Sequence, residues 1–162
     1  MTHPEALDWS SDGCTIERAA EILGDRWSLL ILREVISGIR RFDQMTVRTA
    51  IPRQVLTDRL ERLVAQGILR RAPYREPGQR QRHEYRLTDK GIDLYPVFVA
   101  MQQWGDRYLG EKPGPPTEFE HRDCKERVDL VLRCGAGHEI VSNREVVGRL
   151  GPGAHARGTE VT

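Results

Sequence analysis

The sequence has few cysteines and no long apolar run. Three cysteines in 162 residues are too few, and odd in number, for a disulfide framework. No apolar run approaches the roughly 20 residues needed to cross a bilayer, and the first residues lack the basic start and apolar stretch of a secretory signal. These absences exclude a disulfide-stapled or membrane-spanning chain, and they predict a cytoplasmic protein with reduced cysteines.

Basic charge is present but unevenly distributed. The net charge of the chain is only +1, and all but three of its 25 basic residues are arginines. Between positions 40 and 86, 12 arginines and five acidic residues give a net charge of +7, which leaves −6 for the rest. Guanidinium groups suit bidentate contacts with phosphate or guanine. A basic segment with acidic flanks is typical of a protein that binds a polyanion.

Four helices are predicted in the first part of the chain, because apolar residues recur there at helical spacing. Asp25 can cap the second helix, and Pro52 fits the first position of the fourth, where no partner for an N–H exists. Trp27 is expected to fill the middle of the core, Gly24 to end the first helix in a left-handed turn, and residues 46–51 to form a turn. With caps and terminal glycines included, the predicted ranges are 15–24, 25–38, 42–45 and 52–67.

Beyond the fourth helix the pattern changes to a hairpin and then to a long helix. Residues 69–74 and 83–87 can pair as two short strands, with a Pro-Gly turn at their tip. Thr88 can cap a long amphipathic helix that continues to about Tyr108. The predicted fold class is therefore mostly α with a small β hairpin (α+β).

The chain is long enough for one compact domain with an appendage, and too short for a large multidomain enzyme. A run rich in proline and glycine predicts a linker after the long helix. Beyond it, residues 128–132 and 139–142 show strand-like patterns, and Asn143 can cap a helix to residue 150. The predicted division is a first domain at 1–110, a linker at 111–117, a small ribbon-like, β-containing appendage at 118–150 and a disordered tail at 151–162.

Five separated motifs resemble those of HxlR-type bacterial transcriptional regulators, over about residues 14–108. In chain order they are CTIERAA at 14–20, LGDRWSLLILRE at 23–34, GIRRF at 38–42, VLTDRL at 55–60 and YRLTDKG at 85–91. The resemblance implies a winged helix-turn-helix that binds double-stranded DNA as a homodimer. It also implies that the fourth helix reads DNA and that the basic hairpin is the wing.

The fourth helix has a polar face that can read base edges. A helix in the major groove contacts bases through its exposed first two turns, and the candidates there are Arg53, Gln54, Thr57 and Asp58. Phosphate contacts supply affinity and register. The candidates for these, near the third helix and in the wing, are Arg40, Arg41, Arg48, Arg75, Arg80, Gln81 and Arg82. The alternative is a solvated helix face, and Arg59 and Arg62 are equally consistent with pairing to acidic neighbours on the same helix.

The apolar stripe of the long helix is wider than a helix needs in order to cover a core, so part of it is expected to contact a second surface. In the resembling family the first and long helices form a two-fold dimer, which places two reading helices about one DNA turn apart. The residues expected at this contact are Leu94, Phe98, Met101 and Trp104. The other interpretation is a ligand pocket between the stripe and the appendage, and both arrangements are compatible.

Two cysteine-containing features have chemistry of their own. Cys14 precedes the first helix, and the dipole of that helix favours a thiolate if the sulfur is exposed. Cys14 is therefore a candidate redox sensor. The alternative is that it is a small buried residue at a helix start. The second feature is a set of residues spaced like two zinc knuckles, namely His121, Cys124, Cys134 and His138. Gly137 stands where a ribbon would place its second Cys-x-x-Cys partner, so we predict a ribbon held by packing, with no metal and no cofactor.

The leading hypothesis is a homodimeric, sequence-specific DNA-binding transcriptional regulator, modulated by a small-molecule or redox effector and without contact to a membrane. Two other classes are a small zinc-dependent enzyme that uses the His/Cys set, and a winged helix used for protein contacts. The sequence has no Ser-His-Asp order with a nucleophile elbow, no phosphate-binding glycine loop and no paired carboxylates in an apolar setting. We therefore predict that the protein is not an enzyme.

Overall fold

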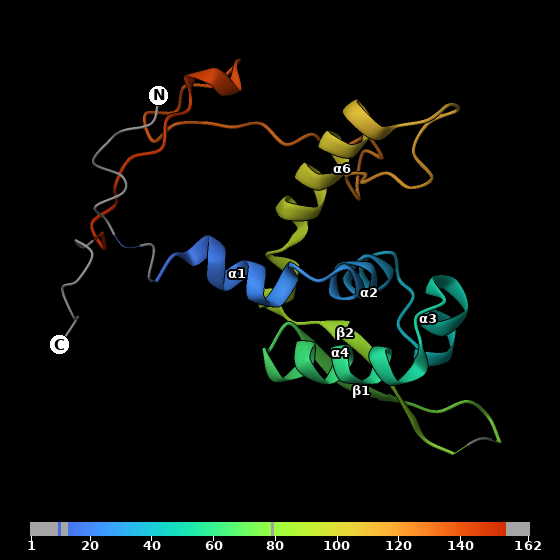
Figure 1. The fold of residues 1–162 in the computed structure, drawn as a ribbon. Helices are drawn as coiled ribbons and strands as arrows, with labels where there is room; N and C mark the ends of the chain where they lie inside the picture. The colour runs from blue at the N-terminus through green and yellow to red at the C-terminus, as the bar shows by residue number, and fades with distance from the viewer. Residues whose placement is uncertain (1–9, 11–12, 79, 155–162) are drawn as a thin grey trace. The chain divides into compact units, whose positions relative to one another are not determined.

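The computed structural model describes residues 10, 13–78 and 80–154 (Figure 1). They fall into two compact units, one of residues 22–131 and one that joins the start of the chain to the segment from 132 onward. Most of the predicted tail, from 155, lies outside the described residues. In this described part, no helix is long and apolar enough to span a membrane. The elements in chain order are α1 (Thr15–Leu23), α2 (Arg26–Ile36), α3 (Phe42–Thr49), α4 (Arg53–Ala65), β1 (Leu69–Tyr74), β2 (Arg82–Leu87), α5 (Asp89–Ile92), α6 (Tyr95–Leu109) and the short 3-10 helix η2 (Asn143–Glu145).

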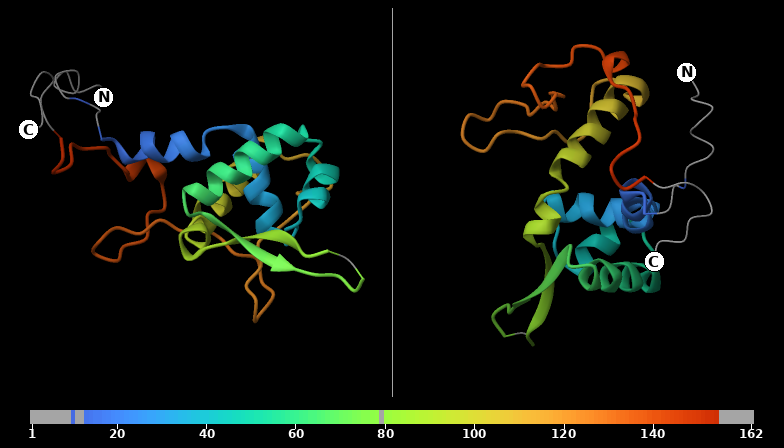
Figure 2. Two further views of the ribbon diagram at one scale, coloured as in Figure 1. Left: turned by 90° about the horizontal axis from the view of Figure 1, so that it is seen from below. Right: turned by 90° about the vertical axis from the view of Figure 1, so that its left-hand side faces the viewer.

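The fold is mostly helical with one two-stranded antiparallel hairpin, which confirms the predicted fold class. Strand β1 pairs with β2 so that Leu69 lies opposite Leu87 and Tyr74 lies opposite Arg82. Gly78 has a φ of +75° and turns the tip. Figures 1 and 2 show α4 running alongside the hairpin, whose tip extends past the end of α4 nearest to α3. The start of α4 and the hairpin tip therefore lie at the same end of this unit.

The core of residues 22–131 is built on α2, which contacts α3, α4 and β2. The side chains with no exposed surface at its centre are Ile31, Leu32, Met45, Leu56, Leu60 and Leu63. The prediction that Trp27 fills the middle of the core is wrong: Trp27 is half-buried at the edge, with the Arg26 guanidinium 5.2 Å from its ring centroid. Trp27 lies in the first turn of α2, so it covers the end of the core rather than its centre.

Asp25 caps α2 as predicted. Its carboxylate accepts hydrogen bonds from the backbone N–H groups of Trp27 (3.1 Å) and Ser28 (3.0 Å) and from the Ser28 hydroxyl (2.5 Å). Arg59 of α4 donates to the same carboxylate at 3.1 Å, which ties α4 to the start of α2. Burial is the largest influence on the Asp25 pKa and raises it, but the hydrogen bonds from Ser28 and the charge of Arg59 together hold this pKa below its ordinary value.

Two predicted helix ends differ from the structure. Helix α3 continues to Thr49, so most of the predicted turn at 46–51 is helical. The hydroxyls of Thr46 and Thr49 donate to backbone carbonyls one turn back. Ala50, with a φ of +53°, ends the helix. Gly24 does not have a positive φ, and the extended cap residue Asp25 of the next helix follows it directly. The left-handed turn predicted at Gly24 is therefore wrong.

The predicted long helix is two helices, α5 and α6. Thr88 caps α5 by accepting from the Gly91 N–H at 3.2 Å. Pro96 explains the break, because its ring would clash with the carbonyl of Ile92, where α5 ends. A Cβ on Gly91 would lie 2.3 Å from the Ile68 carbonyl oxygen, so glycine permits α5 to pack against the start of β1.

The segment after α6 forms isolated β-bridges instead of the strands predicted at 128–132 and 139–142. Within the described residues these bridges join Glu120 to Arg127 and Arg133 to Glu139. The predicted helix to residue 150 is only η2, which Ser142 and Glu145 close with a capping box. Short runs with no third strand and no buried face cannot sustain a sheet, which accounts for the difference.

Candidate nucleic-acid interface

Helix α4 presents a polar face opposite its buried leucines. Arg53, Gln54 and Asp58 are exposed and Thr57 is half-buried, all in its first two turns. The Gln54 amide donates to the Asp58 carboxylate at 2.8 Å, and the Thr57 hydroxyl donates to the Arg53 carbonyl at 3.0 Å. Pro52 is the cap residue, one position before the helix, rather than its first residue as predicted. The four predicted base-reading side chains therefore lie together at the start of α4.

Asp43 of α3 joins α4 to the hairpin. Its two carboxylate oxygens each lie 3.5 Å from a guanidinium, one from Arg53 and one from Arg82 of β2. The Arg53 guanidinium also lies 4.8 Å from the ring centroid of Phe42. We call Asp43, Arg53 and Arg82 the Asp43 bridge. These side chains are exposed, so the ion pairs add little stability, but they hold cationic groups from two elements on one edge of the molecule.

The hairpin is fastened to the chain just before α3. The Tyr85 N–H donates to the Arg40 carbonyl at 2.8 Å, and Arg41 forms a β-bridge with Glu84. The Arg41 side chain pairs with Glu76 and places its guanidinium 4.2 Å from the ring centroid of Tyr74. This arrangement sets the direction of the hairpin beside α3 (Figure 2). The predicted wing residues Arg75, Arg80 and Gln81 are exposed on the loop beyond it.

Glu34 is a buried charge that the sequence analysis did not single out. Its carboxylate has almost no exposed surface and lies between two guanidiniums, with Arg33 Nη2 at 2.5 Å and Arg48 Nε at 3.1 Å. Burial is the largest influence on its pKa and raises it, but hydrogen bonds and charge from both arginines hold the pKa below its ordinary value. An acid inside the most apolar helix, with an arginine next to it, is the signal that could have identified it.

Other arginines of the basic segment have structural partners away from the Asp43 bridge. Arg59 pairs with Asp25 rather than with an acid on its own helix, which was one of the two alternatives for it. Arg71 lies 3.5 Å from Glu61, and Arg86 lies 2.5 Å from Glu84. The basic segment therefore divides into arginines that brace the fold and arginines that gather at the start of α3, the start of α4 and the hairpin.

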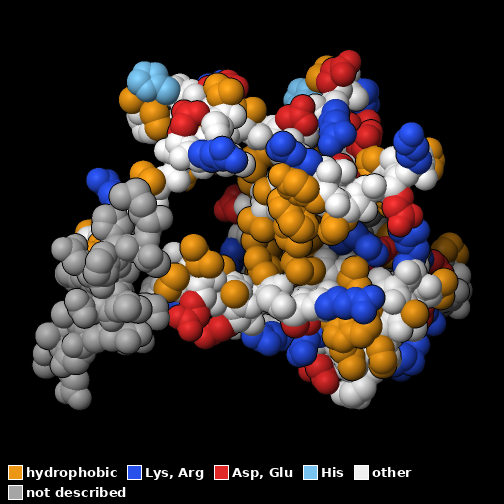
Figure 3. Space-filling model, turned by 45° about the horizontal axis from the view of Figure 1, so that its top comes forward, with side chains coloured by type: hydrophobic (Ala, Val, Ile, Leu, Met, Phe, Trp, Pro, Cys, Tyr) orange, Lys and Arg blue, Asp and Glu red, His pale blue; other side chains and the backbone are white. Residues whose placement is uncertain are grey.

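The apolar stripe of α6 is also divided in two. Phe98 is buried in the core, so it is not available for the dimer contact predicted for it. Leu94 is half-buried and packs against the same core. Met101 and Trp104 are exposed, as are Val97 and Tyr108. We call these four exposed side chains the α6 band. Figure 3 shows hydrophobic side chains gathered over α6.

The cysteine-containing features belong to other segments of the chain. Cys14 is half-exposed just before α1. His121 Nδ1 lies 3.1 Å from Cys124 Sγ, and hydrogen bonding to the backbone of Ala136 and then of His138 lowers the pKa of the Cys134 thiol. Within the described part of the chain, no three His, Cys, Asp or Glu side chains are grouped so that they could hold a metal ion.

A helical core, an exposed helix-turn-helix and a basic hairpin define a winged helix-turn-helix, the architecture of DNA-binding transcription regulators. Residues 22–113 match the family model described as HxlR-like helix-turn-helix. The chain belongs to this HxlR family, and it is a DNA-binding transcriptional regulator.

Relatives and solved structures agree with this assignment. An HTH-type transcriptional regulator of Mycobacterium tuberculosis is 43% identical over 146 residues, which cover 90% of this chain and 91% of the relative. The crystal structure of PA1607, a candidate transcription factor, has a TM-score of 0.71 and 33% identity, and covers 85% of this chain and 96% of its own. The redox regulator HypR in its reduced form has a TM-score of 0.51 and 27% identity, and covers 59% of this chain and 95% of its own.

Proposed function

We propose that the protein is a homodimeric, sequence-specific regulator that reads double-stranded DNA with the start of α4 and contacts phosphates with the wing. The observation that carries this proposal is the Asp43 bridge, which holds Arg53 at the reading end of α4 and Arg82 at the start of β2, next to the loop of the wing. An arginine that is already oriented loses less side-chain entropy when it binds DNA. Arg40, Arg48, Arg75 and Arg80 then supply phosphate contacts around the same edge.

The proposed dimer uses the α6 band together with α1. Four exposed apolar side chains on one stripe of a helix are costly in water and gain free energy when a second copy covers them. A two-fold axis through such a contact sets two α4 helices on successive major grooves of a near-palindromic site. In this assignment residues 1–110 bind DNA and dimerise, 111–117 are a linker, and 118–150 are an appendage.

Effector control is the third part of the proposal. HypR, a structural neighbour, is a redox regulator whose reduced and oxidised forms have both been solved. Cys14 is half-exposed next to α1, one of the two proposed dimer helices, so its oxidation would act on the dimer rather than on α4 directly. A small-molecule effector is the other route of control.

Selection of bound fragments from a genomic library, followed by fluorescence polarisation on the recovered site, tests the DNA-reading role. In the Arg53→Ala/Gln54→Ala variant, the free energy of binding to the specific site is expected to weaken by about 1–3 kcal/mol for each base-contacting side chain removed. Analytical ultracentrifugation is expected to show an intact dimer. The matched control is Arg71→Ala, whose arginine pairs with Glu61 away from the Asp43 bridge. Unchanged affinity in the double variant, or an equal loss in the control, would contradict the proposal and favour a winged helix that contacts proteins.

A further inference from the structure

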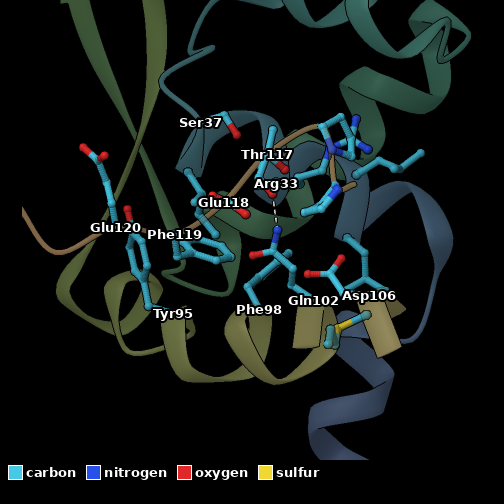
Figure 4. Close-up of a pocket in the computed structure, with 16 residues that line it drawn as sticks. Arg33, Ser37, Tyr95, Phe98, Gln102, Asp106, Thr117, Glu118, Phe119 and Glu120 are labelled. Atoms are coloured by element: carbon cyan, nitrogen blue, oxygen red, sulfur yellow. Dashed lines mark hydrogen bonds between the residues drawn. The ribbon is translucent and has the colours of Figure 1, made fainter. Parts of the chain in front are cut away.

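A pocket of about 520 Å³ lies between α2, α6 and the segment 115–120, all within the unit of residues 22–131 (Figure 4). This volume falls in the usual range for a small-molecule site. The pocket uses one side of α6, through Tyr95, Phe98 and Gln102. Val97, Trp104 and Tyr108 of the α6 band do not line it, whereas Met101 of that band does. The pocket and the proposed dimer contact therefore use largely different faces of the same helix.

Aromatic side chains from two directions form the pocket walls. Tyr95 and Phe98 rise from α6, and Phe119 comes from the segment after the linker (Figure 4). The rings of Tyr95 and Phe119 meet edge to face, with centroids 5.9 Å apart and planes at 71°. Leu29 and Leu30 of α2 line the side of the pocket formed by that helix. Such walls favour a flat, apolar molecule.

Segment 115–120 is held against α6 by polar contacts. The Gln102 amide donates to the Thr117 carbonyl, as Figure 4 shows. Further along, Gln103 donates to Asp129 at 3.0 Å and accepts from the Leu130 N–H at 3.2 Å. Val128 donates to the Phe119 carbonyl at 2.8 Å, which keeps Phe119 in place. The pocket is thus formed by the folded chain rather than by a loose segment.

Every charged side chain that lines the pocket has a partner of opposite charge. Arg33 shares Glu34 with Arg48. Asp106 and Glu118 lie 3.2 and 3.8 Å from Arg127, which also lies 3.7 Å from Asp129. Glu120 pairs with Lys125 at 3.2 Å. Each charged group of the lining is already engaged in an ion pair, so a charged ligand would lose its hydration and compete with an existing partner, which is unfavourable. The remaining polar groups of the lining are neutral, chiefly the Gln102 amide and the hydroxyls of Ser37 and Thr117.

We propose that this pocket is a binding site for an uncharged aromatic molecule that carries a hydrogen-bond acceptor. The rings of Tyr95, Phe98 and Phe119 contact its flat body. Arg33 uses Nε and Nη2 on Glu34, which leaves Nη1 as the donor for a ligand carbonyl. This assignment deepens the effector control proposed above and rests on it for the regulatory role; binding itself is independent of DNA.

The test titrates the full chain, without DNA, into 2-acetyl-6-(dimethylamino)naphthalene, an uncharged aromatic ketone whose emission moves to the blue in an apolar site. Saturable binding of one probe per chain is expected. Uncharged 2-acetylnaphthalene should displace the probe at concentrations at least about tenfold lower than either 2-naphthoate or 2-naphthylmethylammonium, since the charge compensation disfavours both ions. No saturable blue shift, or displacement by an ion as efficient as by the ketone, overturns the assignment.

Variants locate the bound probe. Leu30→Trp fills the pocket from α2 and Phe119→Ala removes one wall, and each is expected to weaken probe binding at least tenfold, with folding checked by circular dichroism. Trp104→Ala removes an aromatic side chain from the other side of α6 and is expected to leave binding unchanged. If Trp104→Ala weakens binding as much as Leu30→Trp, the probe occupies the surface between two copies and the pocket assignment fails. Loss of DNA binding with intact probe binding would instead contradict the proposed function alone.

Discussion

Glu34 shows how a single buried charge connects two parts of the unit. Its carboxylate bridges Arg33, which lines the pocket, and Arg48, which lies in the last turn of α3 beside the proposed DNA contact. A buried carboxylate is tolerated only when it is fully hydrogen-bonded. The described structure has no buried side-chain nitrogen or oxygen without a hydrogen-bond partner, and Glu34 conforms to this.

Replacing Glu34 with Gln is expected to lower the free energy of unfolding by about 1–3 kcal/mol. The substitution removes the negative charge and turns one of the two oxygens that accept from Arg33 and Arg48 into an amide nitrogen, which cannot accept. The pH dependence gives a second readout. The pKa of Glu34 is lower in the folded chain than in the unfolded chain, so its ionised form stabilises the fold. This contribution is complete above the unfolded pKa of about 4.3 and is lost as the pH falls through the folded-state pKa.

Urea unfolding measured from pH 3 to pH 7 checks this prediction. The wild type should lose more stability than Glu34→Gln as the pH falls below about 4.3. Asp25, whose pKa is lowered in the same direction, leaves a residual pH dependence in the variant. Glu111→Gln, at an exposed position, is the matched control and should follow the wild type. Parallel curves for Glu34→Gln and wild type would contradict the role given to the buried carboxylate.

Cys14 is the residue proposed to respond to oxidation. Treatment with diamide is expected to change DNA affinity in the wild type and to have no effect in Cys14→Ser. Diamide oxidises two thiols to one disulfide and is itself reduced to the hydrazine, and the variant has no thiol at position 14. Cys124→Ser and Cys134→Ser are the controls, since both of these cysteines are exposed. Fluorescence polarisation with reduced and oxidised protein makes the measurement. An equal response in Cys14→Ser, or a response lost only in a control, would reject the assignment.

At the scale of elements, the hairpin is held where β2 begins, and its exposed loop projects beyond that point. Arg82 belongs to the Asp43 bridge, and Arg80 lies on the exposed loop before β2. Neutralising DNA phosphates releases counter-ions, and about six neutralised phosphates per dimer give a log–log salt slope near −5. Arg80→Ala/Arg82→Ala is expected to flatten the slope by about 0.9 for each phosphate that the variant no longer neutralises, with little change in site preference.

Binding isotherms between 50 and 200 mM salt, on the selected site and on a scrambled duplex, measure the slope and the preference separately. Arg71→Ala serves again as the control arginine on the same hairpin. A slope that stays the same in the wing variant would remove the wing from the proposed interface. A change in site preference would instead mean that the wing contributes to sequence reading.

The order of elements could be predicted from the sequence because each depends on local patterns. The Asp25 cap, the turn at Gly78 and the buried leucines of α4 follow from capping, turn and periodicity rules. Helix ends were less predictable: α3 continued through threonines that donate to its own carbonyls, and Pro96 divided the last helix. A contact between the long helix and the appendage was one of two interpretations of the apolar stripe. The residues that make it, such as Gln102 with Thr117 and Gln103 with Asp129, depend on packing that no local pattern specifies.

The candidate interface was predicted as a set of residues but not as a geometry. The sequence indicated that arginines are concentrated between positions 40 and 86. It could not indicate which acidic side chain each arginine would pair with. Asp43 meets two arginines that are 29 positions apart in the chain, and Glu34 meets Arg48 of another helix. These long-range pairs depend on the packing of α2, α3 and α4, which no local pattern specifies.

At the scale of the whole molecule, the proposed dimer determines whether one α4 helix or two can engage a site. The α6 band leaves Trp104 and Tyr108 largely in water, with ring centroids 5.5 Å apart. Large exposed aromatic side chains on one stripe are typical of protein interfaces. Dimerisation would bury them and link the second DNA contact to the first, which raises the effective affinity for a two-part site.

Met101→Glu/Trp104→Glu places two negative charges in this stripe on each copy, and like charges across a two-fold contact repel each other. We expect sedimentation of the variant as a monomer, with affinity for the full site reduced to that for an isolated half-site. Val141→Glu, at a valine 90% exposed outside the α6 band, is the control and should remain a dimer. Thermal unfolding distinguishes a folded monomer from a misfolded chain. A variant that still sediments as a dimer would rule out the α6 band as the contact and leave α1 as the remaining proposed surface.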